Sequence, residues 1–190
     1  NNAHKAEEIA TALAFPGWEF RTLRQLGLDS DPAEDADTFE GNARIKAQAA
    51  RAASGGLAVL ADDSGLAVDA LDGDARRALG ALRGRAVRRR GEHAKLLAEL
   101  ADVPDEKRTG RFVCTLVFID EDGAETVARG TIEGRIGREE RGDHGFGYDP
   151  LFLPDVFEDG RTLAEALPEE KNAVSHRGNA LRELRAKLEK

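Results

Sequence analysis

The stretch Leu57-Ala58-Val59-Leu60-Ala61-Asp62-Asp63-Ser64-Gly65 decides the fold class of this chain. Its apolar first half follows Ser54-Gly55-Gly56, and an uninterrupted apolar run of this length is typical of a strand buried on both faces. The Asp-Ser-Gly sequence that follows indicates a turn. A second short strand is expected over 66–71, so two carboxylates are predicted where a buried strand ends.

Helix patterns lie on both sides of this strand. Residues 5–14 favour a helix that Pro16-Gly17 ends, and Asp37-Thr38-Phe39-Glu40 matches a capping box for a helix over 42–53. Two further helices are predicted over 92–101 and 180–190, the latter with Leu181, Leu184 and Leu188 on one stripe.

Strand patterns supply the rest of the sheet. Residues 111–120 and 125–135 flank Asp120-Glu121-Asp122-Gly123, which predicts a hairpin, and residues 18–23 are expected to form a short strand. Strands that alternate with helices, together with a hairpin, predict an α/β fold with a mixed sheet. No repeat or long linker divides the sequence, so a single domain is expected over residues 1–190.

Composition excludes several classes of protein. The 190 residues carry 28 Lys and Arg against 36 Asp and Glu, a net charge of −8, with 41% hydrophobic residues, which is typical of a soluble globular protein. The apolar runs are too short to cross a bilayer, and no cleavable signal pattern opens the sequence, which contains no Met. With one cysteine, Cys114, a cytoplasmic setting without disulfides is expected, and the acidic balance argues against bulk nucleic-acid binding.

The paired carboxylates are the first candidate for chemistry. Successive strand residues point to opposite faces, so Asp62 and Asp63 are expected to differ in role: one binds a hard cation, and the other accepts backbone N–H groups. The alternative is that both simply cap a turn. Glu34, in the acidic loop 29–37, is the candidate for a second ligand, although an acidic loop can also be only a solvated surface.

Three further segments carry polar residues beyond the needs of a fold. Phe146 lies between two glycines and Tyr148 follows the second of them in Gly145–Pro150, which suits stacking on a base, although a core-facing loop is the alternative. The segment Lys171–Arg177 joins two cations and His176 ahead of a helix, where an anion or a purine carbonyl could bind, with plain capping as the alternative. Asn2 and Lys5 would suit a polyphosphate, or Asn2 merely caps a helix. Together these features indicate a nucleoside triphosphate site.

The chain resembles the inosine triphosphate pyrophosphatase family. Five ordered motifs carry the resemblance: Asn-Asn-Ala-His-Lys at 1–5, Thr-Phe-Glu-Gly-Asn-Ala at 38–43, Ala-Asp-Asp-Ser-Gly-Leu at 61–66, Gly-Phe-Gly-Tyr-Asp-Pro at 145–150, and Glu-Lys-Asn-Ala-Val-Ser-His-Arg-Gly at 170–178. The resemblance implies Mg²⁺-dependent hydrolysis of dITP, ITP and XTP to the monophosphate and pyrophosphate. It also implies an elongated α/β fold, with a mixed sheet flanked by helices and two lobes around a central active-site cleft, and a homodimer.

The resemblance also implies roles for individual residues. Asp63 matches the general base, and Glu34 with Asp63 matches the metal site. The substrate-binding residues implied are Asn1, Asn2, Ala3, His4, Lys5, Ser64, Phe146, Gly147, Tyr148, Asp149, Lys171, His176 and Arg177. His176 or Arg177, with main-chain groups of the 145–149 loop, is expected to donate to the purine 6-oxo group, a donor that the amino group of adenine would meet unfavourably.

The sequence departs from the family pattern at three places. It begins inside the first motif, and Asp74–Gly80 replaces the usual Pro-Gly and Ser-Ala-Arg, so no role is carried over to that loop. Glu34-Asp35-Ala36 stands where Glu-Thr-Gly is usual, which leaves Asp35 as an alternative metal ligand. Two other functions compete: a nucleotide- or RNA-binding module using the arginines of 76–90, and a different metal-dependent nucleotide phosphohydrolase. The choice between Mg²⁺ and Mn²⁺ stays open.

Overall fold

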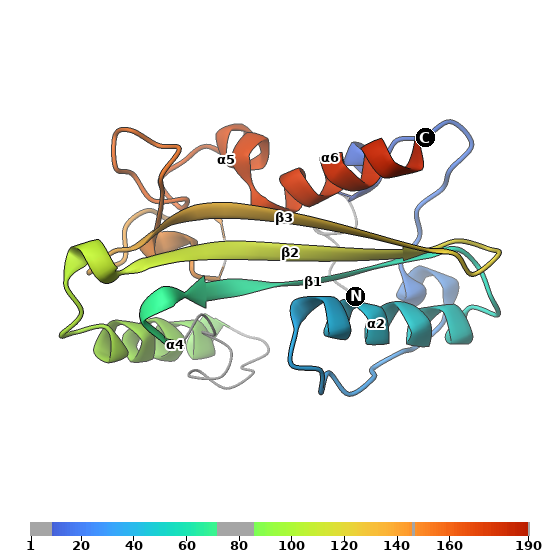
Figure 1. Ribbon diagram of the computed structural model, residues 1–190, viewed down its shortest axis with the longest axis horizontal. Helices are drawn as coiled ribbons and strands as arrows, with labels where there is room; N and C mark the ends of the chain where they lie inside the picture. The colour runs from blue at the N-terminus through green and yellow to red at the C-terminus, as the bar shows by residue number, and fades with distance from the viewer. Residues whose placement is uncertain (1–8, 72–85, 146, 190) are drawn as a thin grey trace. The chain divides into compact units, whose positions relative to one another are not determined.

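A four-stranded sheet in the order β1-β2-β3-β4 is the main feature of the computed structural model, which describes residues 9–71, 86–145 and 147–189 (Figure 1). The strands are β1 (Val59–Val68), β2 (Thr109–Ile119), β3 (Glu125–Ile136) and β4 (Phe152–Pro154). The predicted hairpin is confirmed: the Asp120 amide donates to Ala124 O, and Gly123 adopts φ 87° in the turn. β4 pairs antiparallel with β3, with Gly134 opposite Pro154. The α/β class is confirmed, but the mixed sheet is wrong, because the four described strands run antiparallel.

β1 differs from the expected pair of short strands. It continues through Asp62-Asp63-Ser64-Gly65, where a turn was predicted. The strand tolerates two adjacent carboxylates because their side chains leave on opposite faces and each meets a cation, Arg177 beside Asp62 and Lys46 beside Asp63. The predicted turn is therefore wrong, and the two aspartates lie within a strand.

The helices predicted over 42–53, 92–101 and 180–190 are present with different boundaries, and a further helix over 168–174 was not predicted. The longer ones are α2 (Phe39–Ala53), α4 (Ala86–Glu99), α5 (Pro168–Val174) and α6 (His176–Leu188). The short 3-10 turns are η1 (Leu23–Leu26), η2 (Asp69–Leu71), η3 (Asp105–Lys107) and η4 (Asp149–Leu151). The N-cap of α2 is Thr38, whose hydroxyl accepts from Gly41 N at 3.0 Å, so the predicted Asp37 capping box is wrong.

The segment around Trp18 is not a strand. Residues 9–12 are helical as expected, but 18–22 carry no regular structure, and η1 follows. The Trp18 ring stacks on Phe118 with ring centroids 5.5 Å apart and also contacts Phe15 and Phe20. The alternation of apolar residues here reflects packing on the face of a sheet rather than pairing within it.

The chain divides into two compact units, each with its own core. Unit 1 comprises residues 1–64, 114–130 and 176–190. Alternate residues of β2 face opposite sides of the sheet within this unit: Cys114 and Leu116 pack with Leu181 and Leu184 of α6, while Val117 packs with Ala43 and Ala47 of α2. Accordingly, α2 and α6 lie on opposite sides of the strands in Figure 1.

Unit 2 comprises residues 65–113 and 131–175. Leu96 and Leu100 of α4 pack with Phe112 and Phe152, whose rings meet edge to face at 4.8 Å.

No helix of the described residues is long and apolar enough to span a membrane. Of the arginine-rich segment 76–90, residues 76–85 lie outside the described residues, and the backbone of 86–90 begins α4. A single domain over 1–190 stays a prediction.

Candidate functional site

Asp62 and Asp63 separate by the pleat of β1, as the sequence predicts. Asp62 Oδ2 accepts from Ser64 Oγ at 2.8 Å and lies 3.3 Å from Arg177 Nε. Asp63 is buried, and its Oδ1 lies 2.8 Å from Lys46 Nζ on α2. The two carboxylates therefore serve two different sets of partners, one on each face of the strand.

The Lys46 ammonium lies between two acidic residues of unit 1, Glu34 and Asp63. Its Nζ lies 2.8 Å from Asp63 Oδ1 and 3.2 Å from Glu34 Oε1, and it donates to the Asp62 carbonyl at 3.3 Å. These three residues come from a loop, a helix and a strand, so only the folded unit brings them together. We call Glu34, Lys46 and Asp63 the acidic cluster.

The loop that carries Glu34 is held by the start of α2. The buried Asn42 side chain makes two hydrogen bonds to the backbone of Ala36, each 3.1 Å long: its Oδ1 accepts from Ala36 N, and its Nδ2 donates to Ala36 O. A Cβ at Gly41 would overlap the Ala36 side chain, so a glycine is required there. The Gly41-Asn42 pair thus positions Glu34 beside Lys46, while Asp35 is exposed.

The acidic cluster fits a divalent cation by its donor set. Glu34 Oε1 and Asp63 Oδ1 already converge on one positive charge, the Lys46 ammonium, and both are the hard oxygen ligands that Mg²⁺ prefers. Across the described part of the chain, no group of three or more His, Cys, Asp or Glu residues could hold a metal. Two carboxylates suffice for Mg²⁺ where phosphate oxygens and water complete its shell.

The first turn of α6 carries His176 and Arg177, both buried. Arg177 reaches Asp62 from this turn, so the predicted anion-binding arginine is held by a carboxylate of β1. The helix comes very close to β3, because a Cβ at Gly130 would overlap the His176 carbonyl oxygen and the Ala180 amide nitrogen. Ser175 ends α5, and α6 begins directly after it.

Unit 2 holds a second group of predicted residues. Lys171 of α5 lies 2.6 Å from Asp149 Oδ2, and both side chains are largely buried. Gly145 has φ +80° and leaves no room for a Cβ against the Asp149 carboxylate, while Gly147 has φ +61°. Gly145 therefore packs directly against the carboxylate of a buried ion pair. We call Asp149 and Lys171 the loop ion pair.

Tyr148 is a neutral hydrogen-bonding group in this loop. Burial raises the pKa of its phenol to about 12, and the nearby carboxylates of Glu92 and Glu99 act in the same direction. The ring lies 5.5 Å from that of His93, a buried residue of α4. At neutral pH the phenol keeps its proton and can act as a donor.

Six predicted substrate-binding residues lie outside the described residues: Asn1, Asn2, Ala3, His4, Lys5 and Phe146. The structure brings the others into two groups. Glu34, Asp63, Ser64, His176 and Arg177 belong to unit 1, whereas Gly147, Tyr148, Asp149 and Lys171 belong to unit 2.

Sequence reasoning missed Lys46, which has a detectable signal. Lys46 follows Asn42 by four residues and Ala43 by three, and both of these are buried on α2. A Lys at helical spacing from core positions faces inward and needs an acidic partner. The polar residues on the buried face of α2 were therefore the clue.

A family profile and curated relatives of known name both match almost the whole chain. The Ham1 family profile matches residues 1–187. A dITP/XTP pyrophosphatase from Opitutus terrae is 45% identical over 190 residues, which covers 96% of this chain and 93% of that protein.

Solved structures agree with this match. The structure of a HAM1 protein from Coxiella burnetii has a TM-score of 0.86 at 35% identity. The match covers 100% of this chain and 95% of that protein's chain. The structure of the nucleoside-triphosphatase, or dITP/XTP pyrophosphatase, from Mycobacterium abscessus has a TM-score of 0.77 at 41% identity. The match covers 96% of this chain and 94% of that protein's chain. The motifs, the fold and the sequence identity over almost the whole length lead to one conclusion: this chain belongs to the Ham1 family.

Proposed function

We propose that this chain is a Mg²⁺-dependent nucleoside triphosphate pyrophosphohydrolase, which cleaves dITP, ITP and XTP to the monophosphate and pyrophosphate. Removing these non-standard purine nucleotides from the nucleotide pool is its expected role. The observation that carries the proposal is the acidic cluster of Glu34, Lys46 and Asp63, in a chain 45% identical to a dITP/XTP pyrophosphatase.

Glu34 and Asp63 are the proposed metal ligands. Mg²⁺ bound to their carboxylates would neutralise phosphate charge and stabilise the charge of the transition state. Glu34 is preferred over Asp35 because Glu34 already faces the shared cation, whereas Asp35 is exposed. The Lys46 ammonium, held between the two acids, is placed to attract a phosphate oxygen once a metal satisfies the carboxylates.

Asp63 is the proposed general base. A water oxygen forms a bond to phosphorus at the α–β anhydride linkage, that linkage breaks, and pyrophosphate leaves. Asp63 accepts the proton that the water loses. The buried setting of Asp63 and its contact with Lys46 support this role, because a fixed carboxylate can orient a water molecule.

Phosphate and base are assigned to different groups of residues. Residues 1–5 and Ser64 are proposed to contact the phosphates, and residues 146–149 to stack on the base and read its edge. Lys171, His176 and Arg177 are proposed to hold the purine, with His176 or Arg177 donating to its 6-oxo group. A donor there discriminates against adenine, whose 6-amino group would leave it unpaired.

The broader setting is also part of the proposal. The chain is expected to act as a cytoplasmic homodimer, with an elongated fold of two lobes around a central cleft. These features come from the family resemblance. Sedimentation at several protein concentrations checks the dimer directly.

The test is a substrate panel. ITP, dITP, XTP, ATP, GTP and dCTP are incubated with the protein and Mg²⁺, and the products are separated. Release of pyrophosphate from ITP, dITP and XTP is expected, with loss of turnover in a chelator and its return with added Mg²⁺. Orthophosphate as the product, or preference for dCTP, would instead support another nucleotide phosphohydrolase.

A further inference from the structure

His93 is a buried side chain that the proposed mechanism leaves unused. It lies on α4, three residues before Leu96 and seven before Leu100, both fully buried in the core of unit 2. This spacing puts all three residues on one face of the helix. The position of His93 is therefore set by the core of the unit.

The imidazole contacts the glycine-rich loop directly. Its Nε2 lies 2.8 Å from the carbonyl oxygen of Gly147. A carbonyl oxygen only accepts hydrogen bonds, so Nε2–H is the donor. Glu140 Oε1 lies 3.1 Å from Nδ1, and the Tyr148 ring packs beside the imidazole. The imidazole is thus packed against the Tyr148 ring while it bonds to the loop.

Without this hydrogen bond, the plane of the Gly147–Tyr148 peptide could rotate. Gly147 has φ +61°, and nothing lies within 4 Å of the place where a Cβ would be, so side-chain sterics do not fix its peptide. In a trans peptide, the Gly147 carbonyl and the Tyr148 N–H point in opposite directions. A hydrogen bond to that carbonyl therefore also sets the direction of the Tyr148 N–H.

We propose that His93 is a specificity-determining positioning residue, which selects 6-oxo purines by fixing the orientation of the Gly147–Tyr148 peptide. This inference rests on the proposed function and deepens it. While His93 holds the carbonyl, the peptide has only a donor, the Tyr148 N–H, to offer to a base. A donor matches the 6-oxo group of hypoxanthine and xanthine, whereas a freed carbonyl would accept the 6-amino group of adenine.

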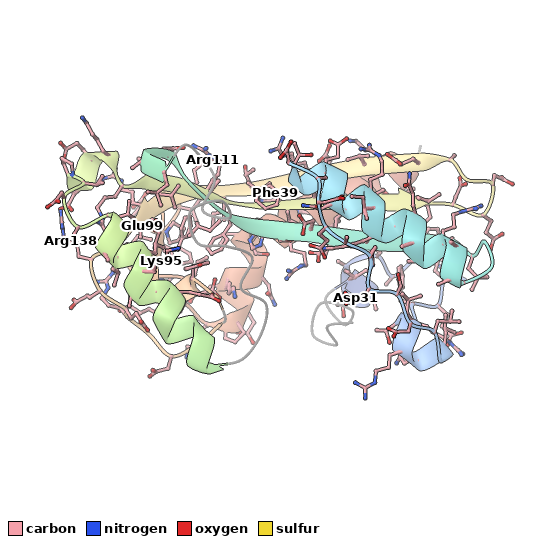
Figure 2. All side chains as sticks on the ribbon, turned by 90° about the horizontal axis from the view of Figure 1, so that it is seen from below. Asp31, Phe39, Lys95, Glu99, Arg111 and Arg138 are labelled. Carbon is pink, nitrogen blue, oxygen red and sulfur yellow. The ribbon has the colours of Figure 1, made fainter. Side chains whose placement is uncertain are left out.

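The test compares two substitutions at one site. His93→Phe keeps a ring beside Tyr148 and removes the donor, whereas His93→Gln keeps an N–H donor of similar reach. The control is Lys95→Gln on the same helix, where Lys95 and Glu99 form an exposed pair with a 3.8 Å contact (Figure 2). Steady-state kinetics are measured with ITP and with ATP in saturating Mg²⁺.

The expected result is a change in selectivity. Losing one specific hydrogen bond lowers the ITP to ATP ratio of kcat/KM about tenfold in H93F. The change falls mainly on KM for ITP, with kcat within about twofold of the parent value. H93Q recovers most of the ratio, and K95Q keeps it.

Contrary outcomes separate the two proposals. Equal losses for ITP and ATP in H93F, or an H93Q variant as unselective as H93F, overturn the role of His93. If the phenyl ring prevents folding, His93→Leu is used instead, because it removes the same donor. The same decrease in the ITP to ATP ratio of kcat/KM is then expected. Wild-type protein that releases no pyrophosphate from ITP would refute the proposed function itself, and this inference with it.

Discussion

At the scale of single residues, the neighbouring Asp62 and Asp63 contact different partners because β1 points their side chains to opposite faces. Asp62 is held with Ser64 and Arg177, whereas Asp63 contacts Lys46 on the opposite face. The continuous strand therefore gives the two adjacent acids different partners, as a structural role for Asp62 and the proposed catalytic role for Asp63 require.

Asp63→Asn is expected to lower kcat for ITP by about 10²–10⁴-fold, because the amide cannot accept a proton from water. Nucleotide binding, measured by calorimetry with the product monophosphate, is expected to persist. Asp69→Asn is the matched control, since Asp69 pairs with Thr109 and Arg111 outside the acidic cluster. An Asp63→Asn variant with wild-type kcat would remove Asp63 from the role of base.

Tyr148 can be titrated alone, because it is the only tyrosine of the chain. Burial is expected to place the ionisation midpoint at about 12 instead of the ordinary 10.0, as measured by tyrosinate absorbance. Between these values the unfolded chain has lost the phenol proton that the folded chain keeps. Stability therefore falls as pH rises from about 10 to about 12. A midpoint near 10 would mean that partial burial does not shield the phenol.

At the scale of elements, the approach of α6 to β3 depends on one missing side chain. Gly130 leaves space that the backbone of His176 and Ala180 occupies. The same turn of α6 presents His176 and Arg177, so the glycine helps to place two predicted site residues.

Gly130→Ala is expected to destabilise the fold by about 1–3 kcal/mol, since an added Cβ forces backbone apart. Gly91→Ala is the matched control: nothing lies within 4 Å of its Cβ position in α4, and alanine favours a helix by about 0.5–1 kcal/mol. Thermal unfolding should therefore show shifts of opposite sign. An unchanged melting temperature in Gly130→Ala would contradict the close approach.

At the scale of the whole molecule, the charge balance restricts partners. The net charge of −8 opposes binding to a polyanion, even with a local group of arginines over 76–90. A single-stranded RNA oligonucleotide is expected to show no binding at 150 mM salt by fluorescence anisotropy. Tight binding that weakens steeply with salt, without nucleotide turnover, would favour the RNA-binding alternative.

Patterns with a strong local cause were predicted well from the sequence. The predicted hairpin at Gly123 forms, and the helices predicted over 42–53, 92–101 and 180–190 correspond to α2, α4 and α6, because turn residues and apolar spacing are local signals. Predictions failed where long-range contacts overrode a local signal. Asp62-Asp63-Ser64-Gly65 was predicted to form a turn but lies within a strand, and the segment at Trp18 was predicted to form a strand but packs on Phe118. Tertiary partners supplied the energy in both cases.

The sequence by itself determined the α/β class, the family resemblance and most of the candidate site residues, because ordered motifs carry chemistry in their residue types. Only the tertiary structure decided that Lys46 joins Glu34 to Asp63, that Arg177 holds Asp62, and that His93 holds Gly147. Each of these pairs joins residues from different elements or loops, and the spacing within one element does not determine which residues of another element it will contact.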